Sequence, residues 1–91
     1  MRIDMEEMQR LIDVAAERIR QYLPEGYEID DISWSDTGFV LHIFNVRTIE
    51  DCRKGPVDRF LFILSRSKTD AENMERFERK LQEFAWNWRK A

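Results

Sequence analysis

The chain has 91 residues, 43% of them hydrophobic and 36% charged, and a formal net charge of −3. This length predicts a single domain over residues 1–91, and the composition excludes an intrinsically disordered chain. The acidic balance gives no support for non-specific binding to nucleic acid or to an anionic membrane.

The cysteine content and the N-terminal residues of the chain indicate the expected cellular compartment. The single cysteine cannot form an intramolecular disulfide, which favours a reducing compartment, so we expect a cytoplasmic protein. The opening segment, MRIDMEEMQR, lacks the apolar core of a secretory signal. No stretch reaches the roughly 18–20 apolar residues that cross a bilayer, and we expect no membrane contact.

Two helices are predicted, one near each end of the chain. Apolar residues recur at spacings of three and four from Ile3 to Leu23, which predicts an amphipathic helix that Pro24 ends. Near the C-terminus, Thr69 and Glu72 have the spacing of a capping box. We therefore expect a second amphipathic helix from this box to about Arg89.

Three strands are predicted between the helices: Tyr27–Ser35, Phe39–Arg47 and Val57–Arg66. In the first strand the apolar residues change parity midway, which predicts a bulge at Asp30-Asp31. Residues 35–38, Ser-Asp-Thr-Gly, predict a hairpin turn, and residues 48–56 a longer connection. The expected fold is α+β: an α-β-β-β-α chain with a three-stranded antiparallel meander and both helices packed on one face. A helix on each face is the alternative.

The third strand holds the apolar run 60–64, so both of its faces are apolar. If the second hairpin closes with Arg47 opposite Val57, then Leu61 and Ile63 lie under the helices. The opposite face would then carry a mainly apolar set, which we predict to be a protein interface: Val40, His42, Phe44, Val46, Phe60, Phe62 and Leu64. Trp86, off the apolar stripe of its helix, is a further predicted interface residue. A twofold dimer would cover such a face with its own copy.

No residue pattern predicts a catalytic, metal or cofactor site. The only histidine, His42, and the only cysteine, Cys52, are too far apart in the predicted fold to form a dyad. Asp30, Asp31 and Asp36 lack the spacing of a calcium loop and are expected to form the bulge and the turn. We therefore expect a non-enzymatic protein without cofactor, with an enzyme built on these carboxylates as a rival hypothesis.

The α-β-β-β-α order is similar to that of the double-stranded-RNA-binding domain. In that family, lysines at the start of the second helix hold phosphates. The matching stretch here, residues 67–72, has one lysine and two acids, and the short 35–38 turn replaces the family's long first loop. The resemblance therefore implies the fold, while RNA binding is an alternative function.

The leading hypothesis is a small acidic protein-binding module of adaptor, chaperone-like or inhibitor type, homodimeric and acting by surface occupation. Its expected partner is a protein or a second copy of itself, and not nucleic acid. A phage-type inhibitor of a host defence complex is a second alternative.

Overall fold

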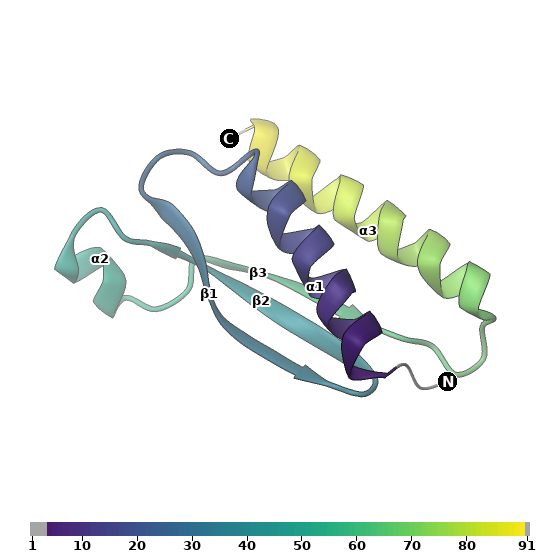
Figure 1. Cartoon of the computed structure of the whole chain (residues 1–91). Coiled ribbons are helices and arrows are strands. Elements are labelled where there is room, and N and C mark those ends of the chain that lie inside the picture. Colours follow the sequence, from purple (N-terminus) through teal and green to yellow (C-terminus); the bar gives the residue numbers. More distant parts are fainter. Residues whose placement is uncertain (1–3, 91) are drawn as a thin grey trace.

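The structure, a computed structural model, describes residues 4–90, and of Lys90 the backbone alone (Figure 1). Its elements in chain order are α1 (Met5–Arg20), β1 (Tyr27–Ser35), β2 (Gly38–Asn45), α2 (Ile49–Arg53), β3 (Asp58–Ile63) and α3 (Asp70–Lys90). The strands form one antiparallel sheet in the order β1-β2-β3. Both long helices lie side by side on one face of this sheet, which confirms the expected α+β fold (Figure 1).

α1 begins where Asp4 caps it, since the Asp4 carboxylate accepts a hydrogen bond of 2.8 Å from the Glu7 N–H. The predicted start, Ile3, lies outside the described residues. α1 ends at Arg20 and not at the predicted Leu23, because the N–H groups of Tyr22 and Leu23 donate to carbonyl oxygens three residues back. Its stripe facing the core consists of Met8, Leu11, Ile12, Ala15, Ala16 and Ile19.

The predicted bulge in β1 is present. Asp30 pairs with His42 and Ser33 pairs with Val40, so two residues of β1 lie opposite Leu41 alone. Asp31, inside the bulge, has a φ of 54°, in the left-handed region. Beyond the bulge Trp34 pairs with Phe39, as predicted, so the apolar residues on both sides of the bulge share the helix-facing side.

The predicted register between β2 and β3 is wrong. Leu41 pairs with Phe60, where the sequence predicted Ile63, so β3 is displaced by three residues. Because side chains alternate along a strand, this odd displacement exchanges the two faces of β3. Phe60, Phe62 and Leu64, predicted on the exposed face, are buried under the helices, and Leu61 and Ile63 are exposed.

Two physical causes account for this register. The predicted hairpin extended β2 to Arg47, but β2 ends at Asn45, and the Val57 N–H donates to the Ile43 carbonyl at 2.8 Å. The observed register also buries the larger side chains of the apolar run. The Phe62 ring lies 5.2 Å from the Phe77 ring of α3, between centroids, in an edge-to-face arrangement.

α2 was not predicted. Its N-cap is Thr48, whose hydroxyl oxygen accepts a hydrogen bond of 3.0 Å from the Asp51 N–H. A threonine followed three residues later by an acid is the same kind of capping signal that predicted α3. Only five residues follow this cap as helix, too few for a recognisable periodicity.

Candidate functional site

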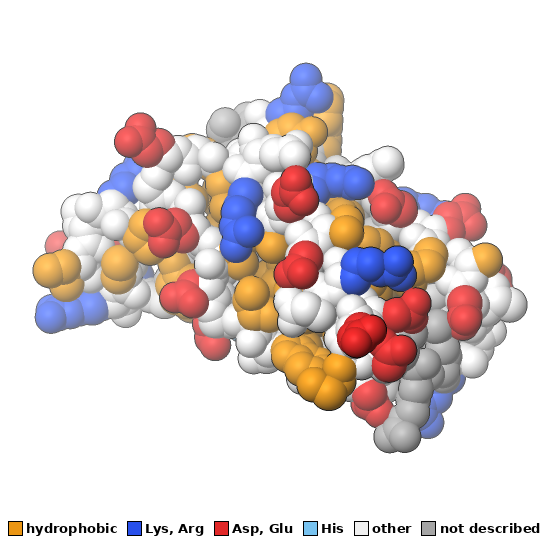
Figure 2. Space-filling model, viewed as in Figure 1, with side chains coloured by type: hydrophobic (Ala, Val, Ile, Leu, Met, Phe, Trp, Pro, Cys, Tyr) orange, Lys and Arg blue, Asp and Glu red, His pale blue; other side chains and the backbone are white. Residues whose placement is uncertain are grey.

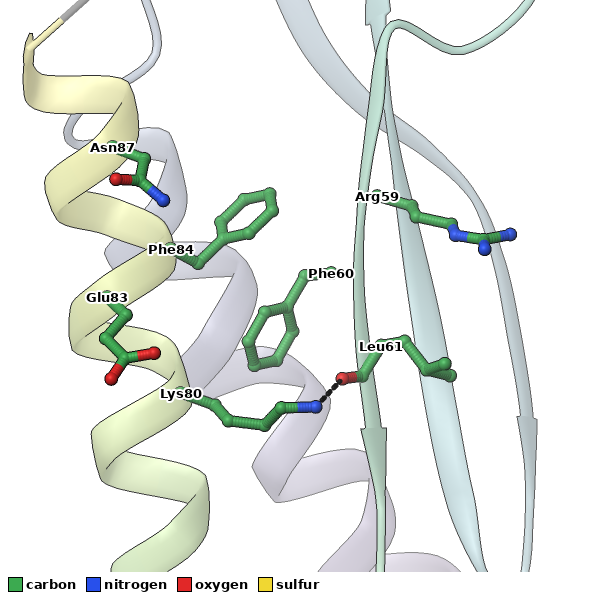
Figure 3. Close-up of a pocket in the computed structure, with 7 residues that line it drawn as sticks. All are labelled: Arg59, Phe60, Leu61, Lys80, Glu83, Phe84 and Asn87. Carbon is green, nitrogen blue, oxygen red and sulfur yellow. Dashed lines mark hydrogen bonds between the residues drawn. The ribbon is translucent and has the colours of Figure 1, made fainter.

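The face of the sheet turned away from α1 and α3, here called the open face, is the candidate site. Alternation along β3 is visible in Figure 3, where Phe60 points toward α3 while Arg59 and Leu61 point away from it. The pairing of the strands assigns the following residues to the open face: Glu28, Asp30, Ser33, Ser35, Val40, His42, Phe44, Arg59, Leu61 and Ile63.

Large apolar side chains remain in contact with solvent on the open face. Leu61 is 40% exposed and Ile63 is 52% exposed, and Val57, just before β3, is also 52% exposed. Beside them, Val40 and Phe44 of the central strand are half-buried. A shallow hollow of about 330 Å³ at the hairpin end of the sheet is lined by residues that include Val40, Leu61 and Ile63 of this face. A clustered apolar surface of this kind is typical of interaction sites.

Gly38 allows the strands at this hollow to lie close together. It pairs with Ile63, and a Cβ atom added at Gly38 would lie 2.3 Å from the Phe62 carbonyl oxygen of β3. Any larger residue at this position would therefore push β3 away from β2. The glycine helps to hold Leu61 and Ile63 in line with Val40.

A row of three polar residues crosses the middle of the open face. The register places Asp30 of β1, His42 of β2 and Arg59 of β3 in line. The His42 Nδ1–H donates to the Asp31 carbonyl oxygen at 2.8 Å. The Asp30 carboxylate accepts a hydrogen bond of 2.8 Å from the Asp31 N–H. Within residues 4–90, neither Asp30 nor Arg59 forms an ion pair, so both charges are available to an external group.

The outer edge of β3 is covered by side chains of α3. Lys80 Nζ donates to the Leu61 carbonyl oxygen at 3.2 Å, across a hollow of about 290 Å³ between the helix and the strand (Figure 3). One turn earlier, Arg76 Nη1 donates to the Ile63 carbonyl oxygen at 3.3 Å. At the opposite edge of the sheet, the bulge at Asp31 interrupts β1. Both features hinder the addition of a further strand, which leaves the open face as the accessible side of the sheet.

The structure separates the predicted interface residues into three groups. Val40, His42 and Phe44 lie on the open face, and Val46 is half-buried just beyond β2. Phe60, Phe62 and Leu64 lie in the core, so their predicted exposure is wrong. Trp86 is 50% exposed on α3, where the Arg89 guanidinium carbon lies 5.3 Å from its ring centroid, and it is not part of the open face.

The sequence did not predict Arg59, Leu61 and Ile63 as residues of the candidate site. They share one parity along β3, so the alternation within the strand is the signal that groups them. That signal assigns a face only when the register with β2 is known. The sequence predicts Asp30 as a bulge former, and its alignment with Arg59 follows from the register of the three strands.

The remaining chemical groups are dispersed. Cys52 is exposed on α2, and the His42 ring is hydrogen-bonded to β1. Over the described part of the chain, there is no group of three or more histidine, cysteine or acidic side chains able to hold a metal ion. No helix among the same residues is both long enough and apolar enough to span a membrane. No family model matches this chain, and neither a curated protein nor a solved structure matches it.

Proposed function

We propose that this chain is a small, non-enzymatic protein-binding module that works as a homodimer in the cytoplasm, with the open face as its binding surface. The observation that carries the proposal is the exposure of Leu61 and Ile63, at 40% and 52%, on a sheet face that neither long helix covers. Burying these side chains against another protein removes apolar surface from water, which favours association.

The open face suits a second copy of the same chain. It carries charges of both signs, acids on β1 and Arg59 on β3, whereas a face of one sign would repel its own copy. Its apolar residues lie on either side of the central polar row, so face-to-face association would bury apolar surface on both sides of that row. The sheet has three strands of six to nine residues, so the interface is small and we expect micromolar affinity.

The distribution of charged side chains favours a protein partner over RNA. The start of α3, which would correspond to the phosphate-binding position of the similar RNA-binding fold, carries Asp70 and Glu72. On the side of the molecule seen in Figure 2, acidic and basic side chains are interspersed. A phosphate backbone is bound by a continuous basic surface, which such a mixture does not provide.

The test is to place a charge on the open face and to measure association. We expect the parent protein to show a monomer–dimer equilibrium at high micromolar concentration in sedimentation experiments. Ile63→Asp should sediment as a folded monomer, because burying a carboxylate in an apolar interface is unfavourable. The matched control is Val14→Asp, at an exposed position on α1, which should dimerise like the parent.

Circular dichroism would establish that both variants remain folded. Dimerisation of Ile63→Asp with the affinity of the parent would show that the open face is not the binding surface. A parent protein that stays monomeric throughout this concentration range would contradict the proposed homodimer.

A further inference from the structure

We propose that two copies meet with their open faces about a twofold axis parallel to β2, so that Asp30 of each copy pairs with Arg59 of the other. This inference rests on the proposed function of the open face and specifies its geometry. It makes Asp30 and Arg59 the residues that decide how two copies are aligned.

The charges on the open face are distributed unequally across the sheet. Glu28 and Asp30 point from β1, at one edge, and Arg59 points from β3, at the other. His42 of the central strand lies between Asp30 and Arg59 in the same row. Adjacent strands lie about 4.8 Å apart, so the backbones of the acid and the base are at similar distances on the two sides of β2.

Symmetry allows two simple orientations for a face-to-face dimer. An axis parallel to β2 places β1 of one copy over β3 of the other, so each Asp30 faces an Arg59. An axis across the strands through the same row places each strand over itself, so Asp30 faces Asp30 and Arg59 faces Arg59. Only the first orientation forms two attractive pairs, and the second juxtaposes like charges, which is unfavourable.

The surroundings of this row favour the pairing. Packed sheets are separated by about 10 Å, a distance that an arginine and an aspartate can bridge from opposite sides. Val40 and Leu61 form the neighbouring row on one side together with Ser33, and on the other side Phe44 lies opposite Glu28. When buried, the apolar side chains of these rows would exclude water from the charge pairs and so strengthen them.

The edges of the sheet disfavour a competing dimer in which the sheets of two copies pair edge to edge. Pairing through β3 would require the Leu61 and Ile63 carbonyl oxygens, which already accept hydrogen bonds from Lys80 and Arg76. Pairing through β1 would have to pass the bulge at Asp31. A continuous six-stranded sheet across two copies is therefore disfavoured, and face-to-face stacking is retained.

The test reverses the charge at position 30 or at position 59 and then mixes the two single variants. Asp30→Arg and Arg59→Asp should each raise the dissociation constant of the homodimer more than about tenfold, since each variant brings like charges together twice. Mixing the two variants should produce a heterodimer, because arginines at 30 and 59 of one chain then face aspartates at 59 and 30 of the other. The double variant D30R/R59D should again form a homodimer.

Matched controls separate this pairing from a general effect of net charge. Glu17→Arg and Arg20→Asp change the net charge by the same amounts at exposed positions on α1, away from the open face, and should leave dimerisation unchanged. The masses of single variants, of the mixture and of the controls can be obtained by sedimentation velocity, with circular dichroism to verify folding.

The outcomes distinguish this inference from the proposed function. Single reversals that dimerise like the parent, or a mixture that contains no heterodimer, would overturn the inferred axis. If Ile63→Asp abolished dimerisation in the same experiments, the open face would still be the interface, in another orientation. If Ile63→Asp had no effect either, the proposed function would fail as well.

Discussion

Individual polar side chains hold α3 against β3 and thereby define which residues of β3 are buried. Near the start of α3, the fully buried Asn73 accepts a hydrogen bond of 2.9 Å from the Ser65 N–H and donates one of 3.1 Å to the Ser65 carbonyl oxygen. Near its end, the Trp88 indole N–H donates to the Asp58 carboxylate at 2.9 Å. Contacts at both ends therefore keep α3 alongside β3, with the phenylalanines between them.

The first prediction concerns the cap of α3. The hydrogen bond that the Thr69 N–H donates to the Glu72 carboxylate, at 2.9 Å, is the main reason why the pKa of Glu72 lies below its usual value. A carboxylate with a lowered pKa in the folded state stabilises the protein above the pKa of the unfolded state, about 4.3. This contribution disappears as the pH falls through the lowered pKa.

Glu72→Gln should therefore lower the thermal midpoint at neutral pH, and the difference from the parent should shrink on acidification below about pH 4.3. The control is Glu83→Gln on the same helix, since Glu83 lies outside the first turn. Melting curves followed by circular dichroism across this range provide the measurement. A difference that stayed constant with pH would show that ionised Glu72 does not stabilise the cap.

At the scale of the elements, the orientation of β3 decides which of its side chains lie in the core and which lie on the open face. The even-numbered residues Phe60 and Phe62 contribute to the aromatic core, while the odd-numbered Leu61 and Ile63 form the open face. Single substitutions on adjacent positions of this strand should therefore have very different effects on stability.

Phe62→Ala should destabilise the fold by about 3–5 kcal/mol, because it removes a fully buried ring from the core. Leu61→Ala should cost less than about 1 kcal/mol in the monomer, because Leu61 is 40% exposed. Urea denaturation at a concentration below dimerisation gives both free energies of unfolding. Equal costs for the two variants would contradict the orientation of β3 described above.

β3 also shows which parts of the structure could be predicted from the sequence and which could not. The two long helices, the three strands and the bulge could be predicted, because periodicity, Pro24, the Thr69 cap and the parity change of β1 are local signals. The register of β3 could not, because residues 60–64 are apolar on both faces and a long connection does not constrain the pairing. The candidate site depended on that register, so the sequence identified the β2 residues of the open face and assigned the wrong residues of β3.

At the scale of the whole molecule, both long helices cover one face of a sheet that has only three strands (Figure 1). One edge is covered by Lys80 and Arg76, and the other contains the bulge at Asp31. The fold thus concentrates its accessible apolar sheet surface on the open face. Trp86 lies elsewhere, on α3 beside Arg89, so association through the open face leaves it outside the interface.

The most direct measurement of the central claim is a dilution series of the unmodified protein followed by heteronuclear NMR. Dimerisation through the open face predicts concentration-dependent chemical shifts at Val40, His42, Leu61 and Ile63, and none of comparable size at Val14 or Trp86. Shifts that cluster instead around Trp86 or along the exposed side of α1, or spectra that do not change with concentration, would contradict the claim that the open face binds a second copy.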